Sequence, residues 1–259
     1  MDNFSTYIFR EEYEKYKKLG DTLSNISDSI DWERFRDLIS PLYKDNKIDG
    51  GRPHLDEIVM IKTLVLQHLY GLSDYEIERN IYDRMSFRHF LGFPDTIPDR
   101  STIWLFRERL INSNCLDLIW EELQHQIDKL GFGIHRGVIQ DATFITTDPG
   151  HAKKDKPRGD EALTRRSKEG TWSKKGNNSY FGYKMHTLVD KEFMIIREVG
   201  TSTASLHDSQ IDLTEPGQTV YRDKGYFGVK PNASMDKTMH RATRDHPLSC
   251  KEKRRNKAI

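Results

Sequence analysis

The stretch Gly131-Phe-Gly-Ile-His-Arg-Gly-Val138-Ile-Gln-Asp141-Ala-Thr-Phe-Ile145 decides the fold, because the sequence pattern changes along it. Before it, apolar residues recur at the three- and four-residue spacing of helices. After it, runs of β-branched and aromatic residues alternate with turn formers, as in strands. The pattern predicts an α + α/β fold, in which an all-helical region precedes a mixed-sheet domain and the boundary falls near residue 132.

The residues before the boundary predict a chain of helices over 31–131. Ser73-Asp-Tyr-Glu76 has the Ser-x-x-Glu form of a capping box, and Asp99 precedes another run with helical spacing. Residues 1–30 are polar and weakly periodic, so they predict a poorly ordered arm or a marginal helix. The predicted helices cover residues 32–39, 55–70, 73–84, 99–110 and 116–130.

The residues after the boundary predict a sheet of several strands. The strand patterns cover 138–145, 180–189, 193–203 and 219–221, and residues 205–213 predict a short helix between the last two.

Composition excludes several classes of protein. The 259 residues correspond to one large domain or two small ones. No window approaches the run of about 18 apolar residues that a membrane helix needs, so we expect a soluble protein. The start of the chain lacks the basic and apolar segments of an export signal. Two cysteines in no metal-ligand spacing exclude a disulfide framework or a zinc ribbon.

The net charge of +1 hides two basic blocks. Residues 153–184 hold ten Lys and Arg against four acids, and residues 237–259 hold eight against two. The rest of the chain is therefore acidic, with a net charge of −11. Concentrated cations on an acidic body indicate local binding to a phosphate backbone, although a single basic run is also typical of a solvated loop.

Two aspartates follow predicted strands at equivalent places. Asp141 comes after Gly137-Val-Ile-Gln140, and Asp223 comes after Thr219-Val-Tyr-Arg222. If these strands are neighbours in one sheet, their carboxylates can share Mg²⁺ or Mn²⁺, which activate water in phosphodiester cleavage. In the alternative reading, Asp141 caps a turn and Asp223 pairs with a neighbouring cation, Arg222 or Lys224.

Five segments follow one another along the chain: Pro98-Asp-Arg-Ser-Thr-Ile-Trp-Leu-Phe-Arg107, Asp141-Ala-Thr143, Phe181-Gly-Tyr-Lys-Met-His186, Ala204-Ser-Leu-His-Asp208 and Asp223-Lys-Gly-Tyr226. Together they resemble the DDE transposases of bacterial and archaeal insertion sequences. The most similar branch is named after insertion sequence five and belongs to the insertion-sequence-four-like superfamily. The similarity runs from about Trp32 to the last residue.

The resemblance implies a helical DNA-binding domain over 31–131 and a ribonuclease-H-like catalytic domain over 132–259. It implies that the protein binds the terminal inverted repeats of its element, nicks DNA with Mg²⁺-activated water and joins the 3′ hydroxyl to a target. Asp141 matches the first catalytic acid and Asp223 the second. Double-stranded DNA, further copies of the chain and a cytoplasmic, nucleoid-associated location in a prokaryote are implied as well.

The chain departs from the family at its third catalytic acid, a Glu on a helix after the last core strand. The sequence ends at Lys253-Arg-Arg-Asn-Lys-Ala-Ile259, and the one late Glu, Glu252, has no apolar helical face around it. We therefore expect a truncated product that lacks its final helices and whose strand transfer is impaired. The alternatives are a non-catalytic DNA-binding product that inhibits the full-length enzyme through mixed oligomers, a remnant, or a stand-alone ribonuclease-H-like nuclease.

The predicted DNA contacts lie in both regions. Residues 73–84 and 101–110 predict a DNA-contacting helix pair, with ordinary helix packing as the alternative. The loop over 153–178 predicts a segment that orders on DNA. Lys184 and His186 share a strand face that we expect beside Asp141. The predicted DNA-binding residues are Arg100, Arg107, Lys174, Lys175, Lys184 and Lys224. His207-Asp208 predicts a helix cap, although the resemblance places it near the active centre.

Overall fold

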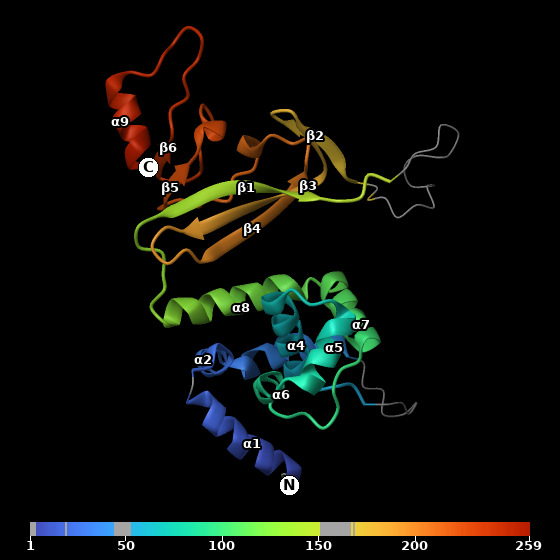
Figure 1. The fold of residues 1–259 in the computed structure, drawn as a ribbon. Coiled ribbons are helices and arrows are strands. Elements are labelled where there is room, and N and C mark those ends of the chain that lie inside the picture. The colour runs from blue at the N-terminus through green and yellow to red at the C-terminus, as the bar shows by residue number, and fades with distance from the viewer. Residues whose placement is uncertain (1–3, 19, 44–52, 151–166, 168) are drawn as a thin grey trace, which may run out of the picture. The chain divides into compact units, whose positions relative to one another are not determined.

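The computed structural model describes residues 4–18, 20–43, 53–150, 167 and 169–259. The chain divides into two compact units, Met1–Gly131 and Phe132–Ile259, which we call the helical unit and the sheet unit (Figure 1). In the described part of the chain every helix is too short or too polar to span a membrane.

The helical unit contains α-helices joined by short turns of 3₁₀ helix. The elements are α1 (Phe4–Lys17), α2 (Thr22–Ser29), η1 (Trp32–Phe35), α3 (Arg36–Ile39), η2 (Ser40–Leu42), α4 (Glu57–Tyr70), α5 (Asp74–Asp83), α6 (Met85–Phe90), α7 (Arg100–Asn112) and α8 (Cys115–Lys129).

Side-chain caps explain where these helices begin. The predicted capping box is confirmed, since Ser73 accepts from the Glu76 amide and Glu76 accepts from the Ser73 amide. Asp56 caps α4 by accepting from the Ile58 and Val59 amides, and Asp99 caps α7 by accepting from the Thr102 amide. Each such cap stabilises a helix by about 1 kcal/mol. Gly71 ends α4 in the left-handed region, at a φ of 63°, where glycine has no Cβ to clash.

The first 30 residues include two helices, so the marginal-helix alternative describes them better than a poorly ordered arm. Tyr13 of α1 is fully buried, stacks on the His89 ring of α6 at 3.8 Å and donates to Asp21. Leu23 of α2 belongs to the main apolar cluster of the unit. The sequence pattern missed this packing because α1 contributes mostly aromatic rings rather than a periodic aliphatic stripe.

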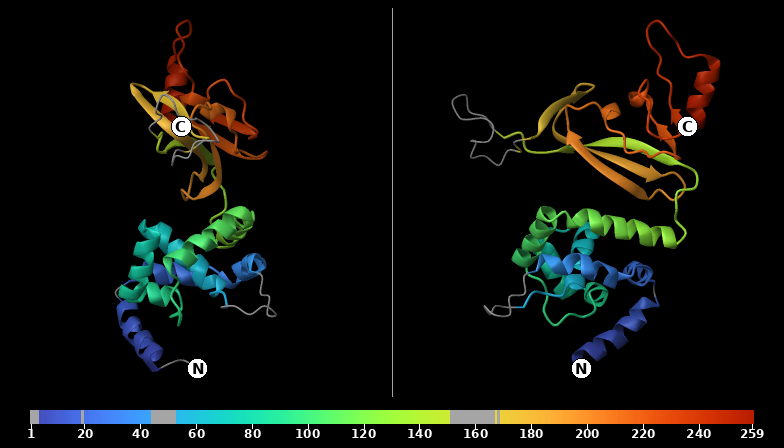
Figure 2. Two further views of the ribbon diagram at one scale, coloured as in Figure 1. Left: turned by 90° about the vertical axis from the view of Figure 1, so that its right-hand side faces the viewer. Right: turned by 180° about the vertical axis from the view of Figure 1, so that it is seen from behind.

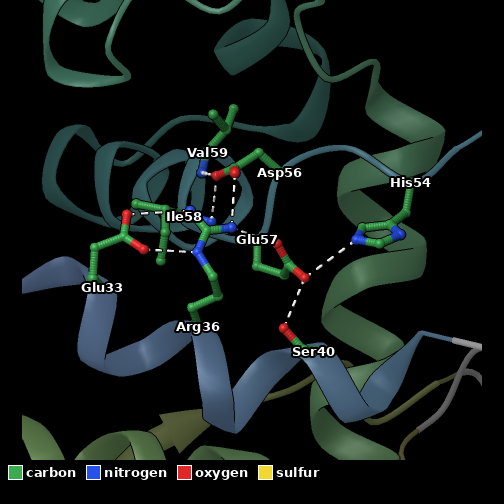
Figure 3. A network of polar contacts seen from close by, with 8 residues as sticks. All are labelled: Glu33, Arg36, Ser40, His54, Asp56, Glu57, Ile58 and Val59. Carbon is green, nitrogen blue, oxygen red and sulfur yellow. Dashed lines mark hydrogen bonds and ion pairs between the residues drawn. The ribbon is translucent and has the colours of Figure 1, made fainter.

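An ionic network joins α3 to the start of α4 (Figure 3). The Arg36 guanidinium contacts Glu33 at 2.7 Å and both Asp56 and Glu57 at 2.8 Å. Burial opposes ionisation of Glu57, yet hydrogen bonds from its own amide, from Ser40 and from His54 lower its pKa. The network therefore holds a nearly buried carboxylate in its charged form at neutral pH.

The sheet unit contains six strands in the order β2-β3-β1-β5-β6, and β4 pairs with β3 as well. The strands are β1 (Val138–Thr146), β2 (Thr171–Lys175), β3 (Asn178–Asp190), β4 (Ile196–Thr203), β5 (Thr219–Arg222) and β6 (Met235–Thr238). β1 pairs antiparallel with β3 and parallel with β5, which makes the sheet mixed as predicted. Two 3₁₀ turns, η3 (Asp208–Gln210) and η4 (Lys224–Tyr226), and helix α9 (Cys250–Ala258) complete the unit.

One face of the sheet is covered and the other is open. Along β1, Val138 and Gln140 are buried whereas Asp141, Thr143 and Ile145 are exposed. The covered face holds a small apolar cluster of Val138, Leu188, Val220 and Ala233, against which Leu213 packs. The alternation places Asp141 on the open face.

Two sequence expectations for this unit are wrong. The predicted helix over 205–213 is only the short turn η3, because Gln140 bonds the backbone of Ile211 (2.7 Å) and Leu213 (3.4 Å) in an extended segment. The predicted loop over 153–178 is wrong at its end, because Thr171–Lys175 form strand β2, which makes a hairpin with β3; its ordering on DNA stays a prediction. Most of the remaining loop, 151–166 and residue 168, lies outside the described residues.

Candidate functional site

The two aspartates singled out from the sequence lie at neighbouring positions of the sheet, where β5 ends beside β1. β1 and β5 pair in parallel with Val138 opposite Val220 and Gln140 opposite Arg222. Asp141 follows Gln140, and Asp223 follows Arg222. Paired strands lie about 4.8 Å apart, so two carboxylates at this place are within reach of a common cation. The strand adjacency that the prediction required is therefore present.

Backbone amides fix one oxygen of each carboxylate. Asp141 Oδ1 accepts from the Ala142 amide at 2.8 Å, and Asp223 Oδ1 accepts from the Gly225 amide at 2.7 Å. Both side chains are exposed. The alternative pairing of Asp223 with Arg222 is not observed, because Arg222 is turned into the covered face, where it donates to Thr238 and to the Val229 carbonyl at 2.8 Å.

Gly225 lets the Asp223 carboxylate lie close to the backbone. A Cβ at this position would come within 2.9 Å of Asp223 Oδ1, closer than carbon and oxygen normally approach. The Asp-x-Gly-Tyr motif thus has a local reason for its glycine, since the carboxylate occupies the space of the missing side chain.

The strand register corrects the predicted place of Lys184 and His186. Asp141 pairs with Thr187, whereas Lys184 lies opposite Phe144 and His186 opposite Ala142. Successive residues of a strand point to opposite faces, so the side chains of Lys184 and His186 lie on the covered face and that of Asp141 on the open face. The alternation of residues along the strand predicted that Lys184 and His186 share a face. It could not predict which face of the sheet is covered.

Lys184 is a buried ion-pair partner and not a surface cation. Its side chain is 9% exposed, its ammonium contacts Asp208 Oδ1 at 2.7 Å, and it donates to the Leu206 carbonyl at 2.6 Å. His186 is fully buried, and its Nε2 lies 2.7 Å from the Ser202 hydroxyl. Burial lowers the pKa of His186, as does the charge of Lys184, while Asp208 opposes the shift.

Tyr226 of η4 ends the sequence motif Asp-x-Gly-Tyr, three residues after Asp223. Tyr226 is 1% exposed, and burial raises its pKa. The negative charges of Asp208, Asp141 and Asp223 raise it further. The turns η3 and η4, which hold Asp208 and Tyr226, contact each other, so Asp208 lies near the turn that follows Asp223.

The donor set suits a hard divalent cation but is small. Mg²⁺ and Mn²⁺ accept one or two protein carboxylates and keep several waters, so Asp141 and Asp223 are chemically adequate ligands. No group of three His, Cys, Asp or Glu side chains able to hold a metal occurs in the part of the chain that the structure describes.

Glu252, the late Glu considered as a third acid, is engaged elsewhere. It lies in α9, forms a capping box with Ser249 and contacts His240 Nδ1 at 2.8 Å. Hydrogen bonds from Ser249 and His240 lower its pKa to about 2.

The other predicted DNA-binding residues differ in whether they are exposed and whether they are ion-paired. Arg100 is exposed at the start of α7, whereas Arg107 is ion-paired with Asp74 and links α7 to α5. Helix packing, the alternative reading, therefore describes Arg107. In the sheet unit, Lys174 and Lys175 are exposed on the β2 hairpin and Lys224 is exposed beside Asp223.

Comparison with known families assigns both units. Residues 11–109 match the family described as Transposase domain (DUF772), and residues 133–257 match the Transposase DDE domain. The chain carries two transposase domains. The DDE domain match covers both aspartates and all six strands, and the other match lies within the helical unit. No solved structure matches the chain.

Proposed function

We propose that this protein is a transposase whose DDE domain holds Mg²⁺ or Mn²⁺ between Asp141 and Asp223 and acts on phosphodiester bonds at the ends of a DNA element. The observation that carries the proposal is the in-register parallel pairing of β1 with β5, because an aspartate follows each member of its last pair, Gln140 and Arg222. We place the chain in the insertion-sequence-five branch on its ordered motifs, and we assign recognition of the terminal inverted repeats to the helical unit.

The residues around the pair have separable roles in this proposal. Bound divalent cations supply an activated water and neutralise the leaving oxygen. Asp141 and Asp223 hold them, and the Gly225 amide keeps the Asp223 carboxylate oriented. The open sheet face leaves Asp141 accessible to a duplex, and exposed Lys224 can contact a phosphate next to Asp223.

Metal-dependent cleavage of a duplex that carries the element's end sequence tests the proposal. Asp141→Asn and Asp223→Asn should each abolish Mg²⁺-dependent nicking and weaken Mn²⁺ binding measured by paramagnetic resonance. Asp148→Asn is a matched control, because Asp148 is also exposed and also accepts from an amide two residues on, at 2.8 Å. Cleavage that survives both substitutions would end the assignment of the site.

A second candidate is a non-catalytic DNA-binding product that inhibits an active transposase through mixed oligomers. It is favoured by the small donor set, since no third carboxylate joins the pair among the described residues and Glu252 is bound to His240. Binding of the end duplex without nicking in either Mg²⁺ or Mn²⁺ would select this candidate over the catalytic one.

A further inference from the structure

Helix α9 is held to the sheet unit without an apolar face. None of its nine residues is buried. Asn256 bonds the backbone of His240 through both ends of its amide, at 2.9 Å each, and Arg255 donates to the Thr238 carbonyl at 2.7 Å. Most helices of this length depend on apolar packing for their stability, so a helix docked by polar contacts alone needs another explanation.

The acidic residue and one cation of α9 are used internally. Glu252 is occupied by the Ser249 cap and by His240, and Arg255 faces the carbonyls of the β6 end. Four cations remain on the exposed surface of the helix, and within the described residues none of them has an ion-pair partner. They are Lys251, Lys253, Arg254 and Lys257, which we call the α9 cations.

The α9 cations repel one another in the free protein. Lys253 and Lys257 are four residues apart on the helix, and Lys251 and Arg254 are three apart, so each pair lies on one face. Like charges at these spacings destabilise a helix. Lys251 also lies in the first turn, where the helix dipole disfavours a cation. A polyanion bound along α9 would remove these penalties.

The helix is anchored to the end of β6 and to His240, and this segment lies beside Arg222, the residue before Asp223. The Met239 amide donates to the Arg222 carbonyl at 2.9 Å, and the rings of Phe227 and His240 lie 5.4 Å apart. Figure 1 shows α9 beside β5 and β6, and Figure 2 shows the same part of the sheet unit from two further sides. A nine-residue helix is about 13 Å long, and B-DNA carries a phosphate charge about every 1.7 Å of its axis, so several phosphates can meet the helix at once.

We propose that the α9 cations form a binding surface for the phosphate backbone of duplex DNA, which guides the duplex toward Asp223. The identity of the polyanion rests on the proposed function. The assignment of the surface rests on the four α9 cations, which are exposed and have no ion-pair partner among the described residues.

Fluorescence anisotropy with a short labelled duplex tests the surface, using the full chain in EDTA so that no cleavage occurs. The variant Lys251→Gln, Lys253→Gln, Arg254→Gln, Lys257→Gln should lose at least about tenfold in affinity. Its plot of log affinity against log salt should flatten by about 2 to 4, since each phosphate contact contributes about 0.9. A variant with Arg in place of the three lysines should bind the duplex as the wild type does. Unchanged helix content in the Gln variant would show that α9 still folds.

The matched control removes one charge from a cation of the sheet unit that is already paired. Arg136 contacts Glu192 at the surface, and Arg136→Gln should change the salt slope little, whereas Arg254→Gln should flatten it by about 0.9. An equal loss of duplex affinity in both single variants, or an unchanged salt slope in the fourfold α9 variant, would overturn the proposal. So would a variant that loses affinity for single-stranded RNA but keeps its affinity for the duplex. Loss of cleavage in Asp141→Asn with normal salt dependence separates the catalytic proposal from this one.

Discussion

The helical unit and the sheet unit are stabilised by different means. The helical unit is built on one large apolar cluster, and Glu57 is its only buried charged residue among those described. The sheet unit has four residues in its buried apolar cluster, yet it buries Lys184, Asp190, Arg197 and Arg222. Apolar packing specifies the first unit, whereas hydrogen-bonded charges specify the second.

This difference follows from what each unit must position. A buried charge is tolerated only when partners satisfy it, so each buried charge fixes the segments that supply those partners. Arg222 joins β5 to β6 through Thr238, and Lys184 joins β3 to the segment around Asp208. Arg222 directly precedes Asp223, and the turn η3 that holds Asp208 contacts the turn η4 that follows Asp223, so these buried charges also support the candidate site.

Removing a ring from the helical core should give the largest loss of stability. Phe106 is 1% exposed, and Phe106→Ala should lower the free energy of unfolding by about 4 kcal/mol through lost burial and the cavity left behind. Trp104→Ala in the same helix is the control, because Trp104 is 54% exposed and should cost less than about 1 kcal/mol. Urea unfolding followed by helical circular dichroism measures both, and equal losses would contradict the assigned core.

Removing one buried charge from the sheet unit should cost somewhat less. Lys184→Met keeps the side-chain volume but leaves Asp208 uncompensated, and we expect a loss of about 3 kcal/mol. Hydrogen exchange should increase in β3 and around residues 204–211, with the helical unit unchanged. Adding Asp208→Leu should recover part of the loss. Lys174→Met is the matched control, because Lys174 is exposed. A similar loss of stability there would mean that removing any positive charge has this effect, and not the loss of the buried ion pair.

The ionic network of Figure 3 should make the helical unit sensitive to acid. The folded state lowers the pKa of Glu57 from its ordinary 4.5, so its contribution is present above that pH and is lost as the pH falls below it. Glu57→Gln should cost about 1 to 3 kcal/mol at neutral pH and progressively less in acid. Urea unfolding at several pH values tests this, and a cost independent of pH would assign the effect to packing.

Local signals in the sequence were sufficient for the elements that decide the architecture. The caps at Ser73 and Asp99 located two helices, and runs of β-branched and aromatic residues located β1, β3 and β5. The proximity of Asp141 and Asp223 followed from equivalent positions after two strands. These features depend on short stretches of chain, whereas the pairing of β1 with β5 was a condition of the prediction that the structure supplied.

The errors arose where structure depends on distant partners. β2 and β6 are short and polar, and only pairing with β3 and β5 makes them strands. The segment 205–213 is extended because Gln140, far away in sequence, binds its backbone. The face of Lys184 depends on register with β1 and on an acid 24 positions away. Neither periodicity nor residue type contains that information.

The smallest expected change in stability belongs to Gly225, although its effect on metal binding should be larger. Ala at this position should alter the free energy of unfolding by no more than about 1 kcal/mol, the value of one hydrogen bond. Its methyl group would displace Asp223 Oδ1, which lies 2.9 Å from the position of a Cβ. Loss of such an orienting contact typically weakens metal affinity by about 10- to 100-fold.

A double-mutant cycle separates this orienting role from a general disturbance of η4. In the wild-type background, Gly225→Ala should weaken Mn²⁺ binding measured by paramagnetic resonance. In the Asp223→Asn background the same substitution should add almost nothing, because the ligand that it displaces is already gone. Equal effects in both backgrounds would mean that Gly225 supports the fold of the turn and not the carboxylate. The sheet unit would then position its acids through the buried charges alone.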